Sequence, residues 1–281
     1  MADIQFQPMD LPSRGVLYRD RDTGTEFLPG GKILLRKMTT EEESILLSQG
    51  QQGLERIAKI VTNCVRLPEA AGTPAKITPA DFLLTDRMAI LLALRTLTFR
   101  TPFYTYTYRC QFCGQTAKAT ANLAEDLPER NPETIADRLL AEKKIASREE
   151  FTLAEPLDLH LPDRKVDIQV RFLRGHDEER IAKRAKRVRM ASNDTHDPSH
   201  IYRMALQLVT IDGTEPREAD REEFVRKLSG EDSAYWRIAV DEIEPGLDLT
   251  VYPTCAGCGA DNELSLPFTA EFFRPAVLQP R

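Results

Sequence analysis

Four of the five cysteines of this chain form two short motifs that look alike. Cys110 and Cys113 stand in RCQFCGQ, Cys255 and Cys258 stand in TCAGCGA, and a glycine follows each Cys-x-x-Cys pair. Structural zinc sites hold four ligands in a tetrahedron, and thiolates bind zinc well. A Cys-x-x-Cys-Gly turn presents two thiolates, and its glycine tolerates the positive φ that the turn needs. We therefore expect the four cysteines to share one structural Zn²⁺, with each motif providing half of the site.

Two other uses of these cysteines fit the sequence less well. A thioredoxin-like redox pair lies at the start of a helix, and no convincing helical pattern follows either pair here. A zinc deaminase carries Pro-Cys-x-x-Cys, whereas Thr254 precedes Cys255. A catalytic zinc keeps one position open for water, and four cysteines would close it. Redox use, catalytic use and unmetallated thiols stay as alternatives at this stage.

Composition limits the class of protein. The chain has 281 residues, a hydrophobic fraction of 41%, a charged fraction of 29% and a net charge of −6. These values are typical of a globular protein and argue against one that coats duplex nucleic acid, which would be basic. No apolar run reaches the roughly 18 residues of a membrane helix, and the first residues do not form a secretory signal. We expect synthesis in a reducing, cytosol-like compartment, with Cys64 as a small buried hydrophobe.

Each cysteine pair needs a hairpin to present it. The segment FYTYTYR at 103–109 alternates aromatic and polar residues, which predicts a strand that runs directly into the first pair. The segment LDLTVYPTC at 247–255 predicts a second strand that leads into the other pair. Two such hairpins that face each other would form a zinc ribbon.

The order of predicted elements before the first pair recurs before the second. Strands, helices and a cysteine hairpin follow one another twice, which predicts an α+β fold of two pseudo-repeated units joined by one shared four-cysteine zinc ribbon. We place the first unit at 1–126, a helical connector at 127–150 and the second unit at 151–281. The helix of the connector is predicted to start with a cap at Asn131–Pro132. The predicted register aligns Ile33, Arg36 and Met38 with Ile168, Arg171 and Leu173, and, after a slip of one residue, Glu42 and Glu43 with Glu178 and Glu179.

Local signals place the other elements. Two strands are predicted around a Pro-Gly-Gly turn at 29–31, and a helix capped by Thr39 or Thr40 follows. A further helix with a cap at Thr78 is expected to begin at Pro79. The segment SHIYRMALQLVTI at 199–211 is predicted to be helical throughout.

Three further features could carry function. A basic run, defined here as Lys183, Arg184, Lys186, Arg187 and Arg189, is a solvated helix face or a docking surface. His196 and His200, with Asp194 and Asp197, lie in a loop that we interpret as a solvated cap rather than a metal site. Phe268, Phe272 and Phe273 pack on the chain's own core or anchor an interface.

Several segments together resemble a known family. They are LPSRGVLY, MTTEEE, the leucine-rich DRMAILLALRTLTF before the first cysteine pair, and FFRP after the second pair. The chain is similar in these marks to baseplate proteins of contractile-tailed (myovirus) phages, related to the T-even baseplate hub or wedge component family with a zinc ribbon.

The resemblance implies a structural part or assembly factor of the tail baseplate without catalytic residues. Its partners would be other baseplate, hub, tube or sheath-associated tail proteins, in multiple copies within a symmetric assembly. The protein would be made in the host cytoplasm and placed in the virion. Two alternatives stay open: a zinc-ribbon nucleic-acid binder, with 103–109 as a base-stacking strand and the basic run as a phosphate contact, and a thiol oxidoreductase.

Overall fold

The computed structural model describes residues 5–19, 24–47, 53–68, 77–191, 199–268 and 270–273. Within these ranges the chain contains both helices and antiparallel strands, so the fold is α+β as predicted. None of the helices in the described ranges is both long and apolar enough to span a membrane.

The first half of the chain builds a small sheet, three helices and a long hairpin. Its elements are β1 (Phe6–Asp10), β2 (Lys32–Arg36), α1 (Thr40–Leu47), α2 (Gly53–Cys64), β3 (Val65–Arg66), α3 (Leu84–Phe99), β4 (Phe103–Arg109) and β5 (Thr116–Asn122). The sheet has the order β1-β2-β3 and is antiparallel, with Met9 opposite Ile33 and Leu35 opposite Val65. Ile33 and Leu35 are buried while Lys32 is exposed, which is the period-two pattern of a strand with one face on the core.

Two boundary predictions in this half are wrong. Of the two strands predicted around the Pro-Gly-Gly turn, only the second is present among the described residues: β2 follows the 3-10 turn Pro29–Gly31 and pairs with β1. The segment before the turn has only an isolated bridge at Glu26. The third helix begins at Leu84 rather than at Pro79. The Thr78 amide and hydroxyl donate to the Asp81 carboxylate, so the predicted cap closes a separate turn ahead of the helix.

The second half contains β7 (Leu157–His160), β8 (Asp167–Val170), α5 (Gly175–Ala191), α6 (Ser199–Gln207), β9 (Leu208–Ile211), α7 (Glu218–Arg226), α8 (Gly230–Ile243), β11 (Thr250–Val251) and β12 (Leu264–Ser265). Its antiparallel sheet has the order β7-β8-β9. The prediction of an unbroken helix over 199–211 is wrong, because the chain leaves α6 after Gln207 and continues as β9. Leu208 is buried at the start of β9 and pairs with Val170, so pairing with β8 overrides helix propensity there.

A connecting segment links the halves. It contains β6 (Glu129–Arg130) and α4 (Pro132–Ala141), and β6 pairs with β10 (Gly246–Leu247) from the end of the second half. The predicted start of α4 is confirmed: the Asn131 side chain accepts from the Thr134 amide, and Thr134 Oγ1 accepts from the Asn131 amide.

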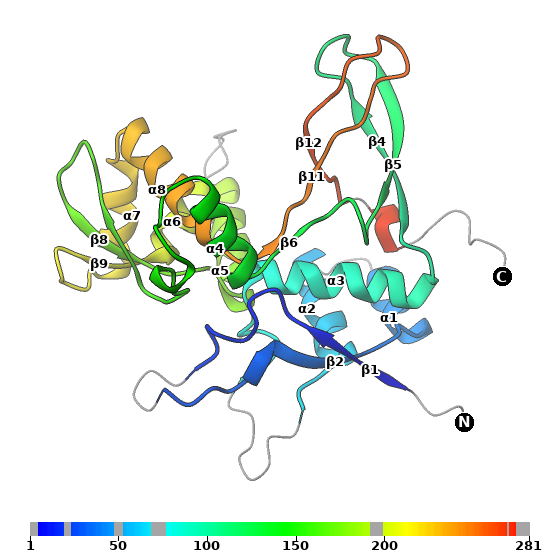
Figure 1. The fold of residues 1–281 in the computed structure, drawn as a ribbon, viewed down its shortest axis with the longest axis horizontal. Helices are drawn as coiled ribbons and strands as arrows, with labels where there is room; N and C mark the ends of the chain where they lie inside the picture. The colour runs from blue at the N-terminus through cyan, green and yellow to red at the C-terminus, as the bar shows by residue number, and fades with distance from the viewer. Residues whose placement is uncertain are drawn as a thin grey trace.

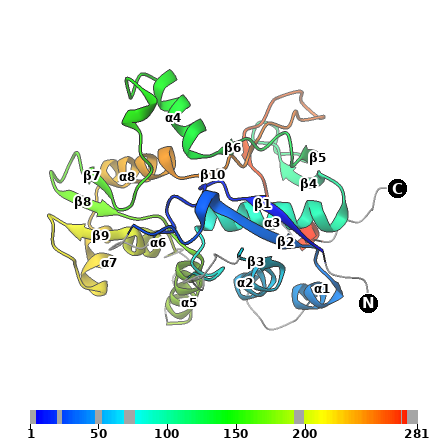
Figure 2. The same ribbon diagram turned by 60° about the horizontal axis from the view of Figure 1, so that its bottom comes forward.

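The halves lie side by side and share one core, with the long helix α3 running through the middle of the molecule (Figures 1 and 2). One continuous hydrophobic cluster contains Leu11, Ile33 and Ile90 from the first half with Ile168 and Trp236 from the second, each almost completely buried. Cys64 is also buried in this cluster, as predicted.

The two cysteine hairpins leave this body together. β4 and β5 run next to the chain around β11 and β12, and the four strands form an arm that projects from one side of the body (Figure 1). The arm has its own hydrophobic cluster, which includes Tyr104, Tyr106, Tyr108, Val251 and Phe272.

Candidate metal centre

The four predicted cysteines meet at the tip of the arm. Their sulfur atoms all lie within 4.8 Å of one another. The closest pairs join one hairpin to the other: Cys110 Sγ lies 3.7 Å from Cys258 Sγ, and Cys113 Sγ lies 3.8 Å from Cys255 Sγ. Four thiolates at about 2.3 Å from a central zinc ion occupy tetrahedron corners about 3.8 Å apart. The arrangement of the sulfurs therefore fits a tetrahedral four-thiolate site.

Both turns have the same backbone. In the first, the Cys110 amide donates to the Gln115 carbonyl and the Gly114 amide donates to the Cys110 carbonyl. In the second, the Cys255 amide donates to Ala260 and the Gly259 amide donates to Cys255. Gly114 and Gly259 each have φ of 72°. This left-handed conformation explains why glycine follows each pair, since other residues are strained there.

Within each turn, one cysteine faces inward and one outward. Cys110 and Cys255 are 2% and 1% exposed, whereas Cys113 and Cys258 are exposed. The centre is thus anchored in the arm and open to solvent on one side. An ion could reach it without disrupting the packing of the arm.

The electrostatic surroundings differ between the cysteines. Amides of Cys113 and Phe112 donate toward Cys110 and lower the pKa of its thiol to about 6, with burial opposing them. The Ala260 amide favours the thiolate of Cys258, but desolvation and the hydrogen bonds that its protonated thiol donates to the three neighbouring sulfurs outweigh it and raise the pKa to about 12. Four thiolates so close together repel one another, and a bound cation offsets that repulsion. The donor set therefore suits a thiophilic divalent ion, and zinc is the ion that such sites commonly hold.

A buried asparagine that the sequence reasoning did not single out joins the two turns. Asn262 is 1% exposed, its Oδ1 accepts from the Gln111 amide at 2.8 Å, and its Nδ2 donates to the Ala260 carbonyl at 3.1 Å. The Gln111 side chain donates in turn to the Glu263 carbonyl. These bonds hold one turn against the other independently of any ion.

The aromatic strand supports the centre from below and is not available for base stacking. Tyr104, Tyr106 and Tyr108 are 2%, 4% and 7% exposed, and Tyr104 donates to the Pro267 carbonyl. The expectation of a base-stacking strand at 103–109 is therefore wrong, because the alternate aromatic positions face the opposite hairpin.

The C-terminal phenylalanines pack on the chain itself. Phe272 is 2% exposed and makes edge contacts with Tyr104, Phe268 and Phe273. The Arg95 Nε donates to the Phe272 carbonyl, and the same guanidinium donates to the carbonyls of Thr101 and Phe103. Of the two readings of this segment, own-core packing holds for Phe272, while Phe268 stays partly exposed.

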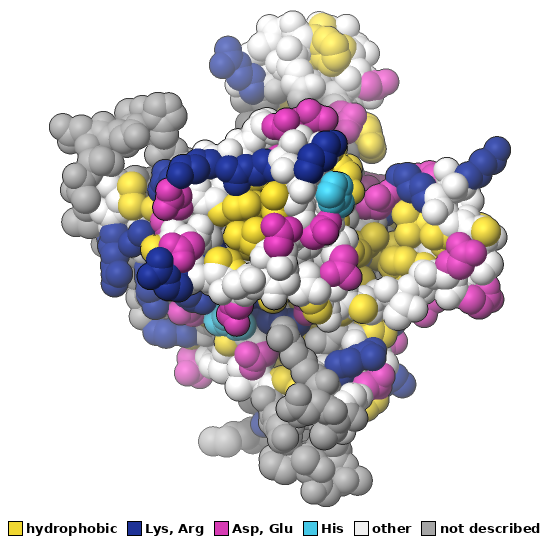
Figure 3. Space-filling view, turned by 90° about the vertical axis from the view of Figure 1, so that its left-hand side faces the viewer, with side chains coloured by type: hydrophobic (Ala, Val, Ile, Leu, Met, Phe, Trp, Pro, Cys, Tyr) yellow, Lys and Arg dark blue, Asp and Glu magenta, His cyan; other side chains and the backbone are white. Residues whose placement is uncertain are grey.

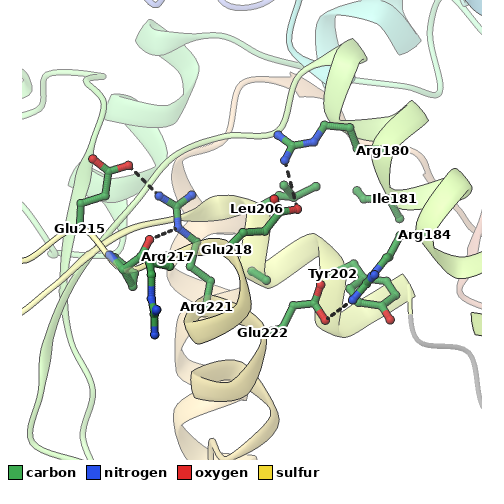
Figure 4. Close-up of a pocket in the computed structure, with 12 residues that line it drawn as sticks. Arg180, Ile181, Arg184, Tyr202, Leu206, Glu215, Arg217, Glu218, Arg221 and Glu222 are labelled. Carbon is green, nitrogen blue, oxygen red and sulfur yellow. Dashed lines mark hydrogen bonds and ion pairs between the residues drawn. The ribbon is translucent and has the colours of Figure 1, made fainter.

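The basic run lies beside an acidic helix. Arg184 pairs with Glu222 at 3.3 Å, Arg180 pairs with Glu218 at 3.4 Å, and Lys183 pairs with Glu179. The arginines border a cavity of about 300 Å³ between α5, α6 and α7 (Figure 4), and Arg184 lies over the Tyr202 ring. Figure 3 shows the face of the molecule on the side of α5 to α8, where positive and negative side chains are interspersed. The side chain of Arg189 lies outside the described residues.

The histidines do not join the cysteine centre. His200 is exposed on α6, and Asp194, His196 and Asp197 lie outside the described residues. The chain also contains one His-x-Glu, at 176–178, which a zinc deaminase would use. There Asp177 pairs with Arg171 and Glu178 pairs with Arg87, and neither belongs to the cysteine group.

A similar ion pair lies at the end of the middle strand of each three-stranded sheet. After β2, Arg36 forms a bidentate pair with Glu42, and the Thr39 amide donates to the same carboxylate. After β8, Arg171 forms a bidentate pair with Asp177, and the Arg174 amide donates to it. Arg36 and Arg171 thus form ion pairs of the same geometry, and Asp177 has the place beside Arg171 that Glu42 has beside Arg36. Glu178 pairs with Arg87 instead, so the predicted slip that aligned Glu42 with Glu178 is wrong.

Two buried aspartates, one in each half, bind loop residues to a helix. Each of these helices lies before a cysteine hairpin in the chain. Asp86 on α3 accepts from the Ser13 amide and hydroxyl, and Asp232 on α8 accepts from the amides of Asp163 and Arg164. Both aspartates are fully buried. The sequence signal was the shared Leu-Pro-x-Arg at 11–14 and 161–164, which the predicted register did not use.

Comparison with protein families gave one match. The family described as T4 bacteriophage base plate protein matches residues 21–274. Comparison with curated proteins and with solved structures found no match. The matched region includes the cysteine centre, α3 and the sheet β7-β8-β9, whereas β1 of the first sheet lies before it.

Proposed function

Since the chain belongs to the T4 bacteriophage base plate protein family, we propose that it is a structural component or assembly factor of a contractile phage tail baseplate. The family match over residues 21–274 is the observation that carries this proposal, because it covers nearly the whole chain. The protein would act through contacts with other baseplate, hub, tube or sheath-associated tail proteins. We place it in the virion after synthesis in the host cytoplasm, in multiple copies within a symmetric assembly.

The proposed ion is one structural Zn²⁺ held by Cys110, Cys113, Cys255 and Cys258. Sulfur separations of 3.7 and 3.8 Å across the hairpins support it. The ion would close a zinc ribbon from two hairpins that are distant in sequence, so its role would be cohesion. Four protein ligands leave no position for a substrate, and a structural family supports a protein without catalysis.

An internal duplication would explain how the two hairpins come to share one site. The proposed units are 1–126 and 151–281, with 127–150 as a connector. Support comes from the common sheet order, the Arg36–Glu42 and Arg171–Asp177 pairs, the aspartates Asp86 and Asp232, and the identical turns at Gly114 and Gly259.

Assembly of tails in the presence and absence of the chain tests the structural role. Tail-gene clusters with and without this gene would be expressed, and baseplates counted by negative-stain electron microscopy. We expect loss of complete baseplates without the gene and recovery when it is supplied separately. Mass spectrometry of purified tails then separates a resident component from an assembly factor. Normal baseplates without the gene would contradict the proposal.

The nucleic-acid alternative can be tested on the same protein. The buried tyrosines and the paired arginines at 180 and 184 count against it. Zinc-loaded chain should not retard duplex or single-stranded DNA at low salt, where electrostatic binding is strongest. Binding that falls steeply with added salt would favour this alternative over a purely protein-binding role.

A further inference from the structure

The outer edge of β5 has backbone groups that the hairpin does not use. The Cys110 amide donates to Gln115 and the Leu123 amide donates to Pro102, so these positions are hydrogen-bonded pairs of the β4–β5 ladder. Pair types alternate in an antiparallel ladder. Lys118 and Thr120, opposite Thr107 and Thr105, are therefore in non-hydrogen-bonded pairs, and their N–H and C=O groups point outward. In the described part of the chain β5 pairs with β4 alone.

A cavity of about 630 Å³ runs along this edge. One wall is β5 from Lys118 to Ala121, and the other is the chain from Thr250 to Thr254 that leads into the second cysteine turn. Tyr252 stands on the far wall with 67% of its surface exposed. The cavity is thus a groove between two hairpins whose strands are not paired with each other.

Charge in the groove changes along its length. Lys118 lies toward the tip of the arm, while Asp126 and Asp248 lie toward the body. An extended chain that runs antiparallel to β5 would begin near the two aspartates and end near the lysine. It would be favoured by a basic residue at its beginning and an acidic residue at its end.

We propose that this groove, called here the β5 groove, binds an extended segment of a partner protein as an added antiparallel strand on β5. The segment would have small or β-branched side chains between a basic first residue and an acidic last residue. Backbone bonds to Lys118 and Thr120 would supply affinity, and Tyr252 would pack over the added strand. The proposal rests on the proposed function for its partner, a tail protein, and names the kind of segment that the arm would take.

Synthetic peptides test the groove without tail proteins. The probe is a capped peptide of alternating Thr and Val with Arg first and Glu last. Zinc-loaded full-length chain is titrated with it, and amide chemical shifts are followed by NMR. We expect saturable binding, with shift changes concentrated at residues 116–122 and 248–254. The reversed peptide, with Glu first and Arg last, and a version N-methylated at alternate residues should bind about tenfold more weakly.

Two proline variants form a matched pair. Thr105 and Thr120 face each other and share one side-chain hydrogen bond, so either substitution removes it. Thr120→Pro removes an N–H on the β5 groove, whereas Thr105→Pro removes one on the opposite edge of the hairpin, where proline is tolerated equally. We expect Thr120→Pro to weaken peptide binding about tenfold and Thr105→Pro to leave it within about twofold.

The outcomes separate the ideas. No saturable binding, equal affinity for the reversed or N-methylated peptide, or equal effects of the two prolines would overturn the strand-addition proposal. Self-association of the chain that Thr120→Pro abolishes and Thr105→Pro does not would assign the edge to a second copy and overturn it as well. If Thr120→Pro does not fold by zinc content and circular dichroism, the N-methylated peptide on the unmodified chain still decides. A negative result in these peptide experiments would not contradict the proposed function, because no tail protein takes part in them. The tail-assembly experiment tests that function separately.

Discussion

The two halves of the molecule share a frame but support their cysteine turns differently. Each frame has a three-stranded antiparallel sheet and a buried arginine–carboxylate pair, Arg36–Glu42 or Arg171–Asp177. The first cysteine turn, however, closes a hairpin with seven paired positions, whereas β11 and β12 pair at only two.

This difference indicates which contacts hold each cysteine turn in place. β4 and β5 have their own ladder and a row of buried tyrosines, so the first turn is fixed by its hairpin. The second turn has only a short set of bonds of its own, the bridge between Thr254 and Asp261 and the Asn262 amide to the Pro253 carbonyl. It therefore depends more on the neighbouring sulfurs and on the bond of Asn262 to the first turn. We therefore expect loss of the ion to loosen the second turn far more than the first.

Cys255→Ser should have the largest effect. It removes a buried ligand from the second turn, and zinc bound by structural sites contributes about 10–16 kcal/mol in peptides. We expect zinc content to fall from one ion per chain to nearly none by native mass spectrometry. Hydrogen exchange should accelerate over residues 253–263 while 104–108 stays protected.

The buried Cys64 provides the control for that variant. It lies in the core of the body, so Cys64→Ala should lower overall stability yet retain the ion. Equal acceleration of both turns in Cys255→Ser would refute the asymmetry. Loss of zinc from Cys64→Ala would show that metal content reports folding of the body rather than the site.

Loss of the arginine from either ion pair should lower the stability of the chain by a similar amount. Arg36→Met and Arg171→Met each leave a fully buried carboxylate without its partner, which typically costs about 3–5 kcal/mol. Urea unfolding should show losses that agree within about 1 kcal/mol. Arg217→Met, which breaks an exposed pair with Asp220, should leave the stability nearly unchanged. A large loss in one half only would break the equivalence of the frames.

Acid should weaken the first frame in a defined range. Burial alone would raise the pKa of Glu42, but hydrogen bonds from Arg36 and Thr39 outweigh it and lower the pKa to about 2. Because this folded-state pKa lies below the ordinary glutamate value of 4.5, the contribution is present above pH 4.5 and is lost as the pH falls toward 2. The pKa of Asp177 is lowered for the same reason: burial would raise it, but the hydrogen bonds and the charge of Arg171 outweigh burial.

Glu42→Gln removes this dependence. The stability difference between the unmodified chain and the variant should be about 3 kcal/mol at neutral pH and should shrink as the pH falls from 4.5 to 2. Denaturant unfolding at a series of pH values measures it. A difference that does not change over this range would mean that the charge of Glu42 is not what stabilises the frame.

Asn262→Ala should have a moderate effect, confined to the arm. It leaves the Gln111 amide without its acceptor, and such a loss costs about 1–3 kcal/mol for a buried group. Zinc release to a chelator should accelerate while the body unfolds at an unchanged denaturant concentration. Gln111→Ala, which removes only an exposed side-chain bond, is the milder control. Equal release rates in both variants would contradict a joining role for Asn262.

The comparison also explains what the sequence could predict. The cysteine spacing and its glycines depend on local turn geometry, and the structure brings all four cysteines together. The alternating strand 103–109 and the capped helix at Pro132 are likewise local patterns, and both are present. The metal itself stays a prediction.

Features set by distant contacts were not predicted from local patterns. β2 pairs with β1 across a long connection, and β9 replaces the end of a predicted helix because β8 offers it a partner. Asn262 looks like an ordinary turn residue in the sequence, and only the approach of Gln111 gives it a role. The equivalence of Glu42 and Asp177 depends on which carboxylate reaches the arginine, and neighbouring acidic residues hid it.

The smallest predicted effect comes from a difference at the ends of the equivalent helices α3 and α8. Arg100 follows α3, where a cation suits the negative end of the helix, whereas Glu244 follows α8.

Burial, reinforced by Asp241, raises the pKa of Glu244 to about 7. Since this pKa lies above the ordinary glutamate value of 4.5, the contribution of Glu244 to stability is fully present below pH 4.5 and is lost as the pH rises through 7. Because Glu244 is only partly buried, solvent screening reduces the effect of this shift, and Glu244→Gln should stabilise the chain by about 1–2 kcal/mol above pH 7 and change nothing below pH 4.5. Glu231→Gln at the opposite end of α8 should destabilise slightly at neutral pH, because a carboxylate is favoured there. Thermal unfolding across pH measures both, and a Glu244→Gln effect that is independent of pH would mean that packing, not charge, distinguishes the two helix ends.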